Sequence, residues 1–125
     1  DYCITQTVKT AGKLTNYDSI PRSIAHGQTR WRMIGNKDWC SGFYPGILWY
    51  LYEYSKDVKW KAKADSFTIT LAPLAYNQAY DHDLGFQMYC SFGNGLRLTG
   101  DTKYKKILLL RLKKLQEEKN LINKL

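Results

Sequence analysis

A chain of 125 residues is long enough for one domain at most, and no apolar run in it is long enough to span a bilayer. Hydrophobic residues make up 44% of it and aromatic residues 14%, a composition that excludes disorder for the body of the chain. The net charge of +8 by itself favours a polyanion such as nucleic acid. The basic residues, however, are spread along two predicted helices as solvated faces, so we expect neither nucleic acid nor a membrane as a partner.

The N-terminal half is expected to hold two helices separated by a long loop. The first helix covers about residues 2–14, where apolar side chains recur at spacings of three and four residues. These side chains are Ile4, Val8, Ala11 and Leu14. A loop rich in Gly, Pro, Ser and Asn follows at residues 16–38. The second helix begins between Ser41 and Pro45, because Ser caps helices and Pro is tolerated in a first turn, and it ends near Tyr54.

Two further helices are predicted after it. Asp57 should cap the third helix, which runs to about Leu71 or Tyr76 because Pro73 kinks or ends it. A fourth helix covers about residues 84–98, although its glycines weaken it.

The last helix is expected to begin at Asp101 or Thr102 and to run toward the C-terminus. Its apolar side chains recur at roughly heptad spacing, with Lys119 interrupting the stripe. They are Leu108, Leu112, Leu115 and Ile122. A stripe of this kind packs against another helix, so we expect the chain to form homo-oligomers, as dimers or larger assemblies.

The helical segments form a weak internal repeat. Residues 54–61 align with residues 98–105 at an offset of 44 residues, and residues 42–43 align with residues 85–86 at an offset of 43. Each unit consists of a helix, a tight turn and a second helix. A repeat of this length predicts an all-α fold of stacked helical hairpins.

The sequence shows no metal-binding pattern. The three cysteines, Cys3, Cys40 and Cys90, are widely spaced without a C-x-x-C pair, so we interpret them as buried free thiols. The two histidines, His26 and His82, are too few for a His-based metal site. We therefore expect neither a metal nor another cofactor.

Two short motifs carry most of the functional information. DWCSGFYPG occupies residues 38–46, with the form D-W-x-x-G-F-x-P-G, and DHDLGF follows at residues 81–86. Together they resemble motifs of the unsaturated glucuronyl hydrolases, glycoside hydrolase family 88. Further similar segments are PRS at 21–23, GILWYLYE at 46–53 and GNGLRLTGD at 93–101. The resemblance runs nearly without a break from Pro21 to about Leu108, corresponds to the N-terminal third of a family member, and ends at an atypical helix at about 109–125.

The resemblance implies a fold. The family is built from six helical hairpins in a closed α/α toroid, of which this chain would form the first two and a half. We therefore expect residues 1–125 to form a single partial α/α-toroid domain, an incomplete barrel whose inner helices have an open flank. Apolar surface on that flank is a second reason to expect self-association.

The resemblance also implies an activity. The substrate is an oligosaccharide left by a polysaccharide lyase, with a 4,5-unsaturated uronic acid at its non-reducing end. An acid protonates C4, water adds at C5, and the resulting hemiketal collapses and breaks the glycosidic bond. Two Asp carboxyls serve this chemistry, one protonated and one ionised. Asp83 matches the first, but no residue after Leu108 matches the second, so we expect this chain alone to be inactive.

Three residues are candidates for the site, and each has an alternative role. Asp83 is the predicted catalytic carboxylate, and the alternative is a helix N-cap. Trp39 is predicted to pack on a sugar ring, and the alternative is a core Trp at a helix entry. His82 would orient Asp83 or contact the substrate carboxylate, and the alternative is a partly exposed loop residue; its neighbour Asp81 departs from the family pattern. The alternative function for the whole chain is a non-catalytic helical fragment that only self-associates.

Overall fold

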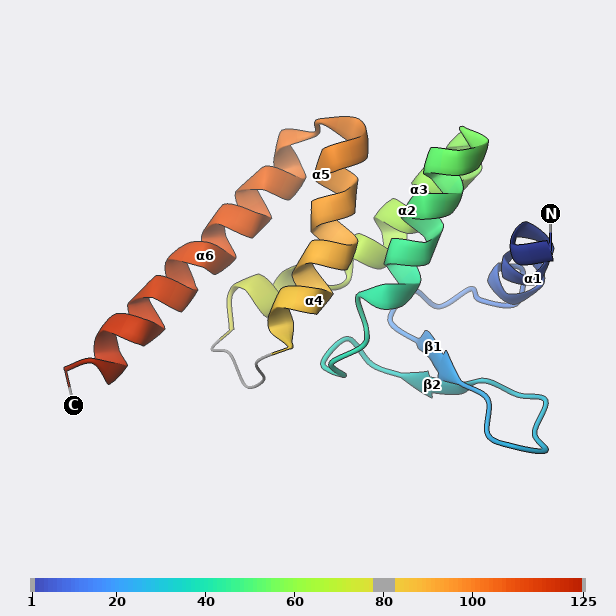
Figure 1. The fold of residues 1–125 in the computed structure, drawn as a ribbon, viewed down its shortest axis with the longest axis horizontal. Helices are drawn as coiled ribbons and strands as arrows, with labels where there is room; N and C mark the ends of the chain where they lie inside the picture. Colours follow the sequence, from blue (N-terminus) through green and yellow to red (C-terminus); the bar gives the residue numbers. More distant parts are fainter. Residues whose placement is uncertain (1, 78–82, 125) are drawn as a thin grey trace.

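Helices form most of the computed structural model, which describes residues 2–77 and 83–124. They are α1 (Tyr2–Ala11), α2 (Phe43–Ser55), α3 (Val58–Ile69), α4 (Leu84–Met88), α5 (Asn94–Thr99) and α6 (Thr102–Ile122). α2 and α3 form one helical hairpin, and α4, α5 and α6 form a second beside it (Figure 1). The predicted helical hairpins are confirmed. Among the described helices, none combines the length and the apolar composition that crossing a membrane requires.

The first hairpin follows from local capping signals. Lys56 takes the left-handed conformation, with φ of 59°, and its N–H bonds back into the last turn of α2. Asp57 then caps α3, because its side chain accepts a hydrogen bond of 2.9 Å from the N–H of Lys59. After α3 a short 3-10 helix, η1 (Ala72–Ala75), forms around Pro73. The predicted cap and the predicted break at the proline are both confirmed.

The second hairpin repeats this geometry 44 residues later. Asp101 caps α6 by accepting a hydrogen bond of 2.9 Å from the N–H of Lys103. The helix predicted at residues 84–98 is present as one continuous helical segment, in which a π turn, η2 (Tyr89–Gly93), joins α4 to α5. The internal repeat therefore corresponds to two hairpins with the same N-cap chemistry.

The core lies where the two hairpins pack together. The large aromatic side chains of Trp49, Phe67, Phe92 and Tyr104 are fully buried there. The rings of Trp49 and Tyr104 meet edge to face, with centroids 5.8 Å apart. A Cβ atom at Gly95 would lie 3.1 Å from both rings, so this glycine lets the hairpins approach closely.

The segment predicted as a loop at residues 16–38 contains a small antiparallel sheet. β1 (Ile20–Ser23) pairs with β2 (Arg32–Ile34), and Ile20 lies opposite Ile34. Ile20 is fully buried against the helical core. The prediction of an unbroken loop is wrong here, because the burial of Ile20 depends on helices that lie far from it in sequence.

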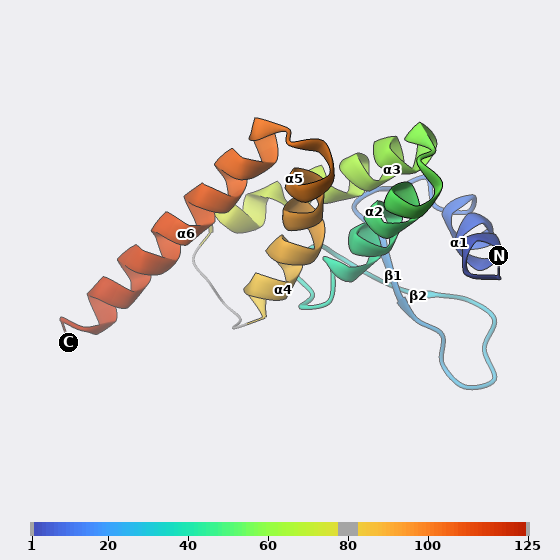
Figure 2. The same cartoon turned by 45° about the horizontal axis from the view of Figure 1, so that its top comes forward.

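The C-terminal half of α6 extends away from the rest of the molecule (Figures 1 and 2). Arg111, which is buried, still connects the helix to the body, since it donates a hydrogen bond of 2.9 Å to the carbonyl of Asn77. Leu108 of the predicted stripe packs against the core. Large apolar side chains are exposed along the rest of the helix: Leu109, Leu112, Leu115, Leu121 and Ile122.

We expect this exposed face of α6 to associate with a second copy of the chain. Replacing Leu112 and Leu115 together by Glu should convert the assembly to monomers, because these leucines are 60% and 43% exposed in the single chain and would be covered only by a partner. Sedimentation velocity at increasing protein concentration measures the change. A matched variant with Glu at the exposed Lys105 and Lys113 should still associate. A wild-type chain that stays monomeric at high concentration would contradict the prediction.

Candidate active site

The two sequence motifs, separated by about forty residues in the chain, are joined in space by one buried side chain. Gln87 lies on α4 and is 1% exposed. Its amide nitrogen Nε2 lies 2.8 Å from the carbonyl oxygen of Asp38, 2.8 Å from Oγ of Ser41 and 3.1 Å from the carbonyl oxygen of Asn36. A buried amide that meets several partners fixes the loop before α2 against the start of α4. We call this arrangement the Gln87 clamp.

Glycines at the start of α2 make this close approach possible. A Cβ atom at Gly42 would lie 2.4 Å from the carbonyl oxygen of Gln87 and 2.5 Å from its Cα atom. A Cβ atom at Gly46, one turn later, would lie 3.1 Å from the carbonyl oxygen of Cys90. The four-residue spacing of the two glycines in the first motif therefore places a flat edge of α2 against α4 and η2.

Three aromatic rings form a row at the N-terminal ends of α2 and α4. Trp39 meets Phe43 edge to face, with centroids 5.9 Å apart. The ring centroid of Phe43 in turn lies 6.4 Å from that of Phe86 on α4. All three are exposed, at 42%, 38% and 55% respectively. The alternative that Trp39 is a core residue is therefore wrong, and we refer to these residues as the aromatic row.

Phe43 and Phe86 were not among the candidate residues, although a signal for them exists. Each is the Phe of a Gly-Phe pair, one in each motif, and the two pairs occupy equivalent positions in the internal repeat. Equivalent positions at the starts of two neighbouring hairpins lie on the same side of the fold. The repeat could therefore have placed both rings in one row.

An ion pair between Arg22 and Asp38 contacts one face of the Trp39 ring. The Arg22 guanidinium lies 2.7 Å from the carboxylate of Asp38 and stacks over the Trp39 ring at 5.8 Å from its centroid. Burial opposes ionisation of Asp38, but hydrogen bonds from Cys40 and the charges of Arg22 and Arg32 outweigh it and lower the pKa of this carboxyl. Asp38 thus stays ionised and holds both Arg22 and the Cys40 thiol, whose Sγ donates to it at 3.1 Å.

The cysteines differ in exposure. Cys3 is exposed on α1, so its interpretation as a buried thiol is wrong. Cys40 and Cys90 are partly buried, and this burial raises the pKa of both thiols. Within residues 2–77 and 83–124, no group of three or more His, Cys, Asp or Glu side chains could hold a metal ion.

Asp83 lies at the N-cap position of α4, less than one turn before Phe86. Its backbone carbonyl accepts hydrogen bonds from the N–H groups of Phe86 (2.9 Å) and Gln87 (3.3 Å). Its side chain, however, does not cap the helix, so the alternative role of a side-chain N-cap is wrong. His82 and Asp81 lie outside the described residues, and the role predicted for His82 stays a prediction.

Comparison with known proteins identifies relatives over most of the chain. An unsaturated glucuronyl hydrolase of Formosa agariphila is 37% identical over 102 residues, which cover 78% of this chain and 25% of the relative. An unsaturated chondroitin disaccharide hydrolase of Streptococcus agalactiae is 34% identical over 89 residues, which cover 70% of this chain and 22% of the relative. The chain thus spans about a quarter of the length of these curated relatives. No protein-family model matches it.

Solved structures give the same result for the fold. The crystal structure of an unsaturated glucuronyl hydrolase specific for heparin superposes with a TM-score of 0.80 at 40% identity, covering 90% of this chain and 30% of that one. The enzyme from Streptococcus agalactiae superposes with a TM-score of 0.74 at 27% identity, covering 93% and 30%. The hairpins are thus part of an α/α toroid. With both motifs packed together and these relatives along most of its length, the chain corresponds to a part of the unsaturated glucuronyl hydrolases that makes up about 25–30% of their length.

Proposed function

We propose that this chain is part of an enzyme that releases 4,5-unsaturated uronic acid from the non-reducing end of lyase-generated oligosaccharides. The observation that carries the proposal is the aromatic row of Trp39, Phe43 and Phe86. The row lies at the N-terminal end of α4, where Asp83 occupies the N-cap position. Exposed aromatic rings pack on the apolar faces of sugar rings, and a carboxyl group beside them can move a proton.

Asp83 is proposed as one of the two carboxyls that hydrate the double bond. One acid delivers a proton to C4, water adds at C5, and the hemiketal that results collapses with cleavage of the glycosidic bond. This reaction forms no covalent sugar–enzyme bond, so the residues must position the ring and the proton rather than supply a nucleophile.

Trp39 is proposed as the wall of the sugar site. Its ring contacts Phe43 edge to face and the Arg22 guanidinium on its face, and Asp38 pairs with that guanidinium in turn. The Gln87 clamp holds the whole segment against α4. His82 is proposed to contact the substrate carboxylate or to orient Asp83. Such support from neighbouring side chains is what a preorganised site requires.

Binding of an unsaturated uronic disaccharide to this chain tests the proposal. The indole N–H resonance of Trp39, assigned by its loss in Trp39→Phe, should shift during a titration followed by nuclear magnetic resonance. Trp39→Leu should weaken binding by about tenfold, because it removes the flat aromatic face. Trp60→Phe, on α3 and outside the aromatic row, is the matched control and should bind as the wild type does. Unchanged affinity in Trp39→Leu would sink the proposed site.

A further inference from the structure

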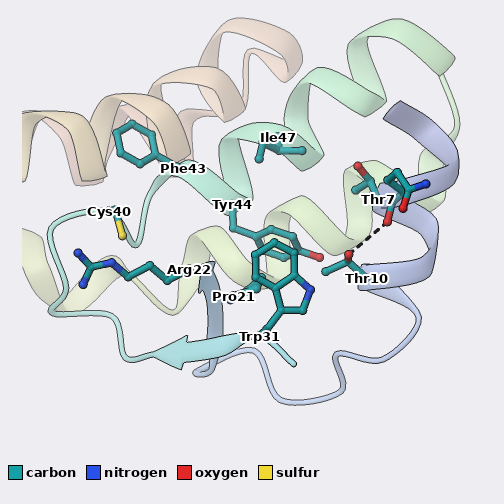
Figure 3. A pocket seen from close by; sticks show the side chains of 10 residues that line it. Thr7, Thr10, Pro21, Arg22, Trp31, Cys40, Phe43, Tyr44 and Ile47 are labelled. Atoms are coloured by element: carbon teal, nitrogen blue, oxygen red, sulfur yellow. Dashed lines mark hydrogen bonds between the residues drawn. The ribbon is translucent and has the colours of Figure 1, made fainter. Parts of the chain in front are cut away.

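A groove of about 630 Å³ lies between α1 and the loop that joins β1 to β2. Lys9 and Lys13 line it from α1 and the turn that follows, and Arg30 lines it from the loop. Figure 3 shows Trp31 and Thr10, which line both this groove and the smaller cavity beside α2 and so mark the boundary between the two. The groove is not lined by any residue of the aromatic row, so it is separate from the proposed sugar site. We call it the basic groove.

The three cations of the basic groove have no counter-charge in the part of the chain that the structure describes. No described Asp or Glu lines the groove, and none of the three forms an ion pair with a described acidic residue. Cations elsewhere are paired, since the guanidinium groups of Arg22, Arg97 and Arg111 each lie within 2.9 Å of a carboxylate. Unbalanced like charges around a concave surface give a positive potential that attracts anions.

Tertiary structure assembles this cluster. Lys9 and Lys13 are four residues apart and share one side of the groove, and the strand β1 separates them in sequence from Arg30 on the other side. All three side chains are exposed. Like charges at this spacing repel each other, so the arrangement is unfavourable in the free chain, and a bound anion would relieve that repulsion.

The positions of the cations favour an extended ligand with several anionic groups. A chain that lies along the groove can meet the two lysines with one anionic group and Arg30 with another. The lining also provides side-chain hydroxyl and amide groups that can bond to the hydroxyls of such a chain: Thr15, Asn16, Ser19 and Thr29. Nucleic acid fits less well, because single strands stack successive bases on several aromatic rings and Trp31 is the one aromatic residue of the described lining.

We propose that the basic groove is a docking surface for a sulfated polysaccharide, which it binds through the sulfate groups of the polymer. The proposal goes beyond the proposed function, because the groove involves neither Trp39 nor Asp83 and the bound polymer is not cleaved there. Its effect is to retain the protein on an acidic polysaccharide by charge.

The test measures binding of fluorescently labelled dextran sulfate by anisotropy, with neutral dextran of the same length as the reference polymer. Replacing Lys9, Lys13 and Arg30 together by Gln should weaken binding by about a hundredfold at about 0.1 M salt. The slope of log K against log salt concentration should become shallower by about 2, as expected for three cations that each contribute about 0.7. Neutral dextran should not bind.

A charge-matched variant separates the groove from the overall charge of the protein. Replacing the exposed Lys59, Lys61 and Lys105 together by Gln removes the same charge from α3 and α6 and should change the affinity by less than about threefold. An equal loss in both variants, or no binding of dextran sulfate to the wild type, would overturn the proposal. Gln has a helix propensity close to that of Lys, so both variants should keep the wild-type circular dichroism spectrum.

The unmodified chain provides a second readout. On addition of dextran sulfate, the indole N–H resonance of Trp31, assigned by its loss in Trp31→Phe, should shift and saturate, whereas that of Trp60 should not move. A Trp31 resonance that does not move would overturn the proposal, and oligothymidylate that binds as tightly as dextran sulfate would show that the occupant is nucleic acid instead. The titration with the unsaturated uronic disaccharide, read at Trp39, is independent of these outcomes, so the proposed function and the docking surface can fail separately.

Discussion

Replacing Gly42 by Ala is expected to lower the free energy of unfolding by about 3 kcal/mol, at the upper end of what overpacking costs. The new Cβ atom would lie 2.4 Å from the carbonyl oxygen of Gln87 and 2.5 Å from its Cα atom. Both are backbone atoms of a helix, so a side-chain rotation cannot relieve the clash. Moving α4 away from α2 would also separate the Gln87 amide from Asp38 and Ser41. Urea unfolding followed by circular dichroism measures the loss.

Gly85 provides the matched control for Gly42, because it is the glycine of the other Gly-Phe pair. A Cβ atom there meets nothing within 4 Å. Since Gly85 lies inside α4, Gly85→Ala should raise stability by about 0.5–1 kcal/mol through the lower backbone entropy of the unfolded chain. Equal stability of the Gly42→Ala and wild-type chains would show that α2 and α4 do not approach as closely as described.

This chain alone is expected to give no measurable turnover of an unsaturated uronic disaccharide. The proposed reaction needs two carboxyls, one protonated and one ionised, held in a closed pocket. Asp83 is proposed as one of them. Asp38, which lies beside Trp39, cannot be the acid, because Arg22 pairs with it and its pKa is lowered. Positioning and preorganised electrostatics supply much of an enzymatic rate, so half of a site should lose nearly all of it.

The assay follows the ultraviolet absorbance of the conjugated double bond, with wild-type and Asp83→Asn chains compared at equal concentration. We expect no loss of absorbance with either. Turnover by the wild type that Asp83→Asn abolishes would contradict the prediction, and a second acid, such as Asp81 or one from another copy, would have to complete the pair. Binding of the disaccharide without turnover, read at Trp39, would separate a catalytic fragment from a chain that only self-associates.

The sequence by itself determined that the chain is helical and where α3 and α6 begin, but it placed the end of the first helix at Leu14, three residues after the observed end at Ala11. Asp57 caps α3 through Lys59, and Asp101 caps α6 through Lys103, two residues away in each case. Interactions of this range are complete within a few residues, so their sequence pattern is enough to predict them. The two motifs likewise indicated the residues of the proposed site, because the residues that carry each motif are contiguous in the chain.

Tertiary structure alone decided how those residues are presented. Trp39 is exposed rather than buried, and Phe86 joins it in one row, because Gln87 binds backbone and side-chain groups 46 to 51 residues away. Ile20 forms a strand instead of a loop because helices distant in sequence bury it. Whether such a residue is buried or exposed, and whether its segment forms a strand or a loop, depends on which surfaces meet. A local pattern of hydrophobic and polar residues does not specify the partner surface.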